Sequence, residues 1–238
     1  MKFLQERDTD ARELMDAPDC DAGKLERTYA RFGAVNAVVS GLRHTYRTQL
    51  RPRFARGRPT TLLDLGCGGG DAAAALARWA ARDGLDLRVT GADPDERAYR
   101  FAAARAPRPN LAFRQAFSSE LVAEGLHFDL VISNHVLHHL DAAALAGFLA
   151  DSVALARAAS VHADLARHPL AYALFSAGAL PMAPGSFIRT DGLTSIRRSY
   201  TPGELRAAVP AGWTVTPEAP FRQLLIHEGP AGAAGTDQ

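Results

Sequence analysis

The chain has 238 residues, 47% of them hydrophobic, so it can bury one sizeable core. Its 27 Lys and Arg residues nearly balance 26 Asp and Glu residues, which argues against nucleic acid or an anionic membrane as partner. Two cysteines that offer no disulfide framework, a charged N-terminus without a signal peptide, and no bilayer-spanning apolar stretch together predict a cytoplasmic globular protein without membrane insertion.

The N-terminal part, residues 1–58, is predicted to form a helical cap. Apolar side chains recur there at nearly helical spacing between Leu25 and Leu42. A stretch rich in arginine and proline, 51–59, then marks the joint with the core, which we expect to span 59–228. The tail 229–238, rich in glycine and alanine, is expected to be disordered.

Short apolar segments alternate with alanine-rich helical segments from residue 60 onward. We predict parallel strands at 60–66, 87–93, 110–117, 128–134 and 159–165. Residues 212–229 instead predict two strands joined by a short turn, which add an antiparallel edge to the same sheet. The expected fold is α/β: a Rossmann-like, doubly wound, mostly parallel sheet of seven strands with a C-terminal edge hairpin.

The turn after the first strand, in LLDLGCGGGD at 62–71, contains four glycines. Glycines allow a tight turn there and let a ligand approach bare backbone N–H groups. The helix that follows presents its positive end to an anionic group. Neither the dinucleotide-binding GxGxxG spacing nor a P-loop is matched, which disfavours an NAD(P)-dependent enzyme.

This ten-residue stretch resembles the first motif of class I S-adenosylmethionine (SAM)-dependent methyltransferases, an acid followed by alternating glycines. The resemblance covers the core from residue 60 to about 165. It implies SAM as cofactor, S-adenosylhomocysteine as product, and an acid at the end of the second strand that holds the ribose hydroxyls. The implied contacts are Asp64, Gly66, Cys67, Gly68, Asp93, Pro94 and, where the fourth strand ends, Asn134. The alternative is an ordinary strand–helix turn with Asp93 as a solvated cap.

Two further regions match the family more loosely. After the third strand, Gln115, Ala116 and Phe117 stand where many members carry an acid for the adenine amino group. Phe117 can lie against the adenine face and Gln115 can bind its edge, or both can be core or surface residues.

The N-terminal helix resembles that of ubiquinone/menaquinone-type C-methyltransferases. This resemblance implies that Tyr29 contacts SAM as part of a lid; the alternative is a helix packed on the sheet.

The segment FDLVISNHVLHHLD resembles the fourth motif of the same family. His135 and His138, three residues apart, share a face if the segment is helical. A phenol titrates near ~10 and a histidine near ~6.5, so a histidine here suits the role of general base. His135 is the first choice and His138 the second; the alternative is that they only orient SAM or line the cleft. No further Cys or His spacing supports a metal site, so no metal is expected.

The segment 166–200, after the fifth strand, reads as an insertion that covers the acceptor. It mixes apolar and polar side chains, which suits a pocket for an aromatic molecule of modest size. The predicted substrate-binding residues are His139, His162, Asp164, His168, Tyr172 and Arg189. His162 and Asp164 are also alternative bases, although residues at strand ends often have a structural role.

These observations predict a SAM-dependent methyltransferase of secondary metabolism. The methyl group would go to oxygen or carbon of a small, hydrophobic, hydroxylated aromatic, quinone-like or polyketide-like acceptor. Oxygen is slightly favoured because the site offers bases. The sequence shows no basic groove or target-recognition domain for nucleic acid. A homodimer is compatible with the sequence, and a catalytically silent SAM-binding regulatory or scaffold protein is the alternative function.

Overall fold

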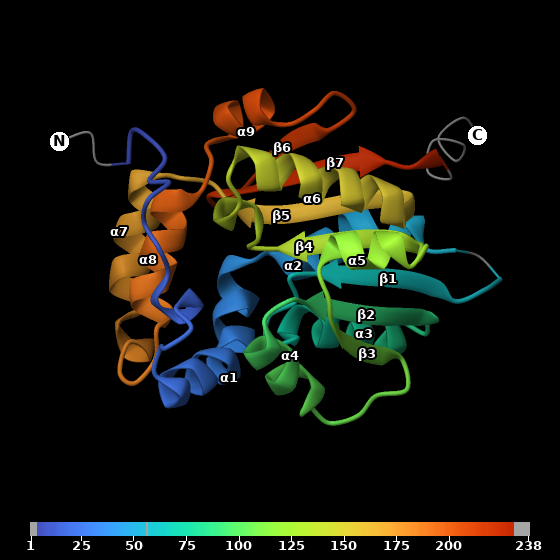
Figure 1. Cartoon of the computed structure of the whole chain (residues 1–238), viewed down its shortest axis with the longest axis horizontal. Coiled ribbons are helices and arrows are strands. Elements are labelled where there is room, and N and C mark those ends of the chain that lie inside the picture. Colours follow the sequence, from blue (N-terminus) through green and yellow to red (C-terminus); the bar gives the residue numbers. More distant parts are fainter. Residues whose placement is uncertain (1–3, 56, 231–238) are drawn as a thin grey trace.

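The computed structural model describes residues 4–55 and 57–230, in which one seven-stranded sheet carries helices on both faces (Figure 1). The strand order is β3-β2-β1-β4-β5-β7-β6. Five strands pair in parallel: β1 (Thr60–Leu65), β2 (Leu87–Asp93), β3 (Leu111–Gln115), β4 (Phe128–Asn134) and β5 (Ala156–Leu165). β7 (Arg222–Glu228) pairs antiparallel with both β5 and β6 (Thr214–Glu218). The predicted Rossmann-like sheet with an antiparallel C-terminal edge is confirmed.

The helices alternate with the parallel strands as predicted. Asp95 and Asp141 cap the helices that follow β2 and β4, because their side chains accept hydrogen bonds from the backbone N–H groups of Arg97 and Ala144. The helices are α1 (Ala22–Val39), α2 (Leu42–Thr45), α3 (Asp71–Arg82), α4 (Glu96–Ala103), α5 (Ser118–Ala123), α6 (Ala142–Leu155), α7 (Pro169–Gly178), α8 (Ile188–Arg198) and α9 (Pro202–Ala208).

The core lies on both faces of the sheet because the central strands are buried on each side. Leu62 of β1 packs with α3 on one face, and Leu63 packs with α5 and α6 on the other. This explains why the apolar Leu62 and Leu63 are neighbours in β1 and do not alternate with polar residues. Tyr46 and Leu50, which follow α2, are fully buried in the same cluster as Leu62. The second half of the predicted cap therefore packs as part of the core.

The first residues differ from the predicted helical cap. Within residues 4–21 the structure has only a short 3₁₀ turn, Leu14–Asp16, and α1 begins at Ala22. This segment lacks the regular apolar spacing of α1, so it cannot bury one helical face. It instead runs alongside α8, where the backbone N–H of Asp8 donates to the carbonyl of Arg197 (Figure 1).

The insertion 166–200 contains α7 and α8, which lie beyond the carboxyl ends of β4 and β5 (Figure 1). Parallel strands place all their carboxyl ends at one edge, so the loops that leave β1, β2 and β4 meet these helices there. No helix within the described ranges is both long enough and apolar enough to cross a membrane. Of the predicted disordered tail, residues 231–238 lie outside the described residues, and Gly229 still donates a backbone hydrogen bond to Ala158.

Candidate active site

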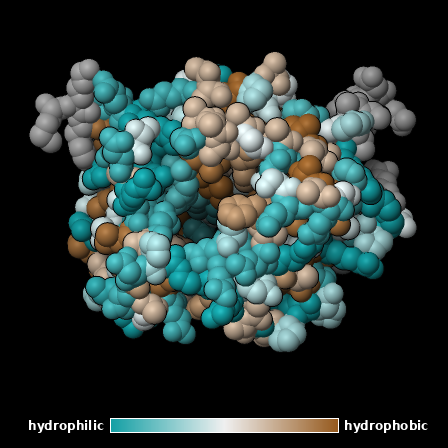
Figure 2. All heavy atoms as spheres, in the orientation of Figure 1, coloured by the Kyte–Doolittle hydropathy of each residue, from teal (hydrophilic) through white to brown (hydrophobic). Residues whose placement is uncertain are grey.

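A cavity of about 1100 Å³ opens at the carboxyl ends of the strands (Figure 2). The β1–α3 loop and the ends of β2 and β4 form one side of it, and α1, α7, α8 and residues 13–16 form the other. In Figure 2 the surface is hollowed near its middle, and hydrophobic side chains stand at the rim. Pockets that bind one drug-sized ligand measure about 300–1,000 Å³. The cavity therefore has room for a nucleoside-sized ligand together with a second small molecule.

The glycine turn lines this cavity with backbone that carries no side chains at Gly66, Gly68 and Gly69. Gly66 has φ +68°, and a Cβ there would stand 2.7 Å from a side-chain methyl group of Val136. Gly68 has φ +52°, and its Cβ position meets no atom of the described residues within 4 Å. Gly66 is therefore needed for the close approach to the loop after β4, whereas Gly68 faces open space.

Asp64 provides a buried carboxyl group at the cavity wall. Its side chain is 1% exposed, and neither carboxylate oxygen has a hydrogen-bond partner among the described residues. Burial, reinforced by the nearby Asp71 and Asp93, raises the pKa of Asp64 well above its usual value. A buried carboxyl group without a partner is costly in folding. It is well suited to a cationic ligand that supplies the missing hydrogen bonds.

Asp93 lies where β2 ends and lines the cavity together with Pro94. One carboxylate oxygen accepts the backbone N–H of Gly68 at 2.8 Å, and the other accepts that of Asp95 at 2.9 Å. Each oxygen retains a lone pair for a ligand, and the two backbone bonds fix the orientation of the carboxylate. Tyr29 of α1, buried against Phe101, lines the same part of the cavity.

The residues at the end of β3 and just after it differ in position: two of them line the cavity and Gln115 lies outside it. Ala116 and Phe117 line the cavity, and Phe117 is 60% exposed. Gln115 is exposed, lies outside the cavity wall, and donates from its side-chain amide to the carbonyl of Pro94 at 3.3 Å. Its predicted contact with the adenine edge is therefore not supported by its position, because the amide is already bound to backbone.

His135 lies at the cavity wall beside Asn134 and has a left-handed backbone conformation, φ +61°. For a non-glycine residue this conformation costs roughly 1–2 kcal/mol. Its backbone N–H donates to the carbonyl of Ala163 at 2.9 Å, which holds the strained residue in place. Neither ring nitrogen has a hydrogen-bond partner among the described residues, and Nδ1 lies 3.8 Å from an Asp164 oxygen. The residue therefore lines the cavity, and its two buried ring nitrogens keep unused hydrogen-bonding capacity.

His138 is buried between two carboxylates. Its Nδ1 lies 2.8 Å from Asp164 Oδ1, its backbone N–H donates to Asp164 Oδ2 at 2.8 Å, and its Nε2 lies 3.3 Å from Glu13 Oε1. Burial alone would lower the pKa of His138, but the two carboxylates outweigh it and raise this pKa to about 10. The second-choice base does not suit its predicted role, because the imidazole already carries its proton at neutral pH.

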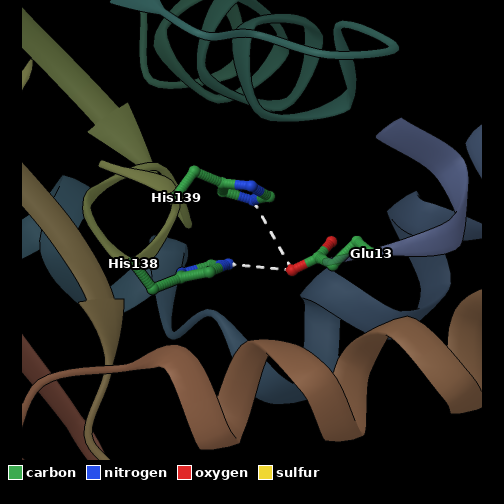
Figure 3. A group of neighbouring side chains, drawn as sticks. All are labelled: Glu13, His138 and His139. Carbon is green, nitrogen blue, oxygen red and sulfur yellow. Dashed lines mark ion pairs between the residues drawn. The ribbon is translucent and has the colours of Figure 1, made fainter. Parts of the chain in front are cut away.

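His139 lines the cavity, and its ring stacks on that of His138 with centroids 4.3 Å apart (Figure 3). Its Nε2 lies 3.6 Å from Glu13 Oε1, and its Nδ1 lies 3.3 Å from Asp16 Oδ2. Glu13 and Asp16 also line the cavity, and the sequence analysis missed both. No motif surrounds them, and they reach the site only because residues 4–21 run alongside α8.

His162 is corrected from a substrate contact to a core residue. It is fully buried between Phe148 and Trp213, lies outside the cavity wall, and its Nδ1 is 2.9 Å from the Ser133 hydroxyl. Burial lowers its pKa to about 3, so it stays neutral. Asp164 shares its face of β5 but lies two residues nearer the carboxyl end, where it reaches the histidines instead.

We expect His162 to make the fold sensitive to mild acid. Below about pH 6.5 the unfolded chain takes up a proton at His162, whereas the folded chain takes none until about pH 3. Stability should therefore fall by about 2 kcal/mol from this group between pH 7 and pH 5. His162→Phe should lose that part of the slope, measured by urea unfolding at both pH values. An unchanged slope would show that His162 is protonated in the folded chain.

Three predicted substrate contacts in the insertion lie outside the cavity wall. His168 accepts the backbone N–H of Leu170 and stacks on Phe221, and the Arg189 guanidinium donates to Ser176. The residues of α7 that line the cavity recur every three or four positions, as one face of a helix does, and Tyr172 is not among them. The wall is formed instead by small and apolar residues, Ala171, Leu174, Phe175, Gly178, Met182, Ile188 and Ile196. The sequence analysis did not resolve the two helices of the insertion and so could not find these faces.

Comparison with known proteins agrees with this geometry. A family model described as a methyltransferase domain matches residues 62–172. Ubiquinone biosynthesis O-methyltransferase of Methylobacterium sp. (strain 4-46) is 33% identical over 202 residues, covering 82% of this chain and 76% of the relative. The chain belongs to the class I SAM-dependent methyltransferases. Its methyl donor is SAM.

Solved structures share the fold of this methyltransferase at low sequence identity. The magnesium protoporphyrin IX methyltransferase from Synechocystis PCC 6803, with bound S-adenosylhomocysteine, is 17% identical and matches with a TM-score of 0.54 over 84% of this chain and 85% of that one. The plantazolicin methyltransferase in complex with a substrate analogue and S-adenosylhomocysteine is 12% identical, with a TM-score of 0.55 over 87% of each chain. At these identities the likeness concerns the fold alone.

Proposed function

We propose that this methyltransferase transfers a methyl group to a hydroxyl oxygen of a small, hydrophobic, hydroxylated aromatic, quinone-like or polyketide-like acceptor. The main support is His135, which lines the same cavity as the residues assigned to the donor and the apolar residues of α7 and α8, and whose ring lies 3.8 Å from an oxygen of the buried Asp164. The name of the relative from Methylobacterium, which specifies O-methylation in ubiquinone biosynthesis, points the same way. A ring carbon beside an ionised hydroxyl is the alternative acceptor atom, since it needs the same base.

The residues of the first side fit SAM. Asp64 has a buried carboxylate without a partner, which is complementary to a cationic amino group, and Gly68 leaves backbone open to the ligand. Asp93 has a fixed carboxylate suited to a pair of ribose hydroxyls. When bound, SAM supplies a methyl group on a sulfonium that is already a good leaving group. The protein has to orient the two ligands, exclude water and remove a proton.

His135 is the residue we assign to proton removal. A phenol is mostly protonated at neutral pH, and an imidazole within reach can accept its proton as the new oxygen–methyl bond forms. The carboxylate of Asp164 stabilises the resulting imidazolium and the orientation of the ring. Cytoplasmic location, secondary metabolism and a homodimer stay predictions from the sequence.

Incubation with radiolabelled SAM and a panel of phenols, catechols and hydroxyquinones tests the proposal. We expect label in at least one aromatic acceptor, with the methyl on oxygen by mass spectrometry. Leu174→Glu, which puts a charge on the apolar wall, should raise the KM of that acceptor roughly tenfold without changing SAM affinity. Leu170→Glu is the matched control, because Leu170 is equally exposed on α7 but lies off the wall. Tight SAM binding without any labelled product would favour the silent SAM-binding alternative.

A further inference from the structure

The group Glu13, His138 and His139 has the spacing of metal ligands. Glu13 Oε1 lies 3.3 Å from His138 Nε2 and 3.6 Å from His139 Nε2, and the three atoms all lie within 4.8 Å of one another (Figure 3). Four ligands at about 2.0–2.1 Å from a tetrahedral Zn²⁺ stand roughly 3.3 Å apart. The observed spacing therefore needs only small shifts to hold one ion.

Both histidines are oriented as metal-binding histidines usually are. The Nδ1 atom of His138 faces Asp164 at 2.8 Å, and that of His139 faces Asp16 at 3.3 Å. Ligating histidines almost always donate their second ring N–H to such a carboxylate, which leaves the other nitrogen for the metal. Here that other nitrogen is Nε2 in both rings, and both Nε2 atoms lie near Glu13. An ion that binds there displaces the Nε2 proton of His138, which is released to solvent.

The contact between His138 and Glu13 is poor as a simple hydrogen bond. His138 Nε2 is buried, yet no neighbour among the described residues meets hydrogen-bond geometry with it. Glu13 Oε1 is also buried and accepts the Ser195 hydroxyl at 2.7 Å, which holds the carboxylate toward the rings. This buried nitrogen is therefore held by an ion pair with Glu13 at 3.3 Å and not by a well-directed hydrogen bond.

We propose that Glu13, His138 and His139 bind one divalent transition-metal ion, with Zn²⁺ as the best match. Two imidazoles and one carboxylate are a ligand set typical of Zn²⁺ sites that keep an open position. All three residues line the cavity, so the open position faces the cavity. The role of the ion rests on the proposed function: it would bind the acceptor hydroxyl and ease loss of its proton to His135.

Spacing within the sequence could not reveal this site, and no metal was expected from it. His138 and His139 are neighbours, but Glu13 lies far ahead of them in the chain and belongs to no motif. The ligand set exists only because the segment before α1 crosses the cavity beside α8.

Titration of chelator-treated full-length protein with Co²⁺ tests the site directly. We expect visible absorption bands of four- or five-coordinate Co²⁺, saturating at one ion per chain, and displacement by Zn²⁺ that binds with a Kd of about 1 µM or below. Glu13→Gln and His139→Ala should each weaken binding at least about tenfold, and Asp16→Asn should weaken it less. His168→Gln, a histidine outside the cavity, is the matched control and should bind as wild type does.

Metal binding is measured by Co²⁺ absorption and methyl transfer by labelled product, so the metal site and the methylation of a hydroxyl group can fail independently. His139→Ala, at a half-buried position, keeps the test valid if variants of the buried His138 do not fold. Absent Co²⁺ bands, or bands that persist in a Glu13→Gln, His139→Ala double variant, would overturn the metal site. Loss of bands in the variants with unchanged SAM calorimetry would support it. Intact metal binding without methylation of any phenol would contradict only the role of the ion and the proposed function.

Discussion

Replacement of His135 by alanine is expected to lower the turnover number about 10²- to 10⁴-fold, the usual contribution of a general base. The physical reason is positional: His135 is the histidine at the cavity whose ring nitrogens have no hydrogen-bond partner among the described residues, whereas His138 is tied to two carboxylates. SAM affinity should change little, because the variant keeps the hydrogen bond from the backbone N–H of residue 135 to Ala163. That bond holds the loop after β4 in place without the ring. Single-turnover rates and calorimetry with SAM measure the two quantities separately.

A second variant separates catalysis from backbone strain. His135→Gly removes the ring and also relieves the left-handed conformation at φ +61°. We expect it to be about 1 kcal/mol more stable than His135→Ala and equally slow. Turnover restored by glycine would mean that alanine acted through the backbone, and full turnover in both variants would remove His135 as the base.

Replacement of Asp93 by alanine is expected to raise the Kd of SAM about 100-fold. The carboxylate has two backbone N–H partners, Gly68 and Asp95, and a pair of ribose hydroxyls would add hydrogen bonds to a charged group, each worth about 1.5–3 kcal/mol. The expected loss of SAM affinity has two causes. The variant lacks the hydrogen bonds to the ribose, and it also lacks the acceptor for the backbone N–H of Gly68 in the glycine turn. Calorimetry with SAM and with S-adenosylhomocysteine should show the same fold-change for both.

Asp93→Asn distinguishes the two causes. One amide oxygen can still accept a backbone N–H, so the turn is partly kept while the charge is lost, and we expect an intermediate Kd. Glu96→Ala is the control, since Glu96 is an exposed acid on the adjacent helix α4 and lies outside the cavity wall. Equal SAM affinity in wild type and Asp93→Ala would exclude the ribose contact.

The donor side of the site was the more predictable half. Asp64, Gly66, Gly68 and Asp93 lie at strand ends in short continuous motifs, and parallel strands bring their carboxyl ends to one edge by geometry alone. The acceptor side depends on how helices pack. His168 and Arg189 share the insertion with Phe175 and Ile188, yet only the last two face the cavity, because each helix turns one face inward.

Residue order alone was enough to predict the alternation of strands and helices, the parallel sheet with its antiparallel edge, and the glycine turn proposed to receive SAM. These are local properties: apolar periodicity and backbone conformations that only glycine adopts at low cost. Only the packing of distant segments places His162 in the core, sets His138 between two carboxylates and brings Glu13 to the histidines. Burial and the approach of charges from distant segments control these outcomes, and neither is encoded in the spacing of neighbouring residues.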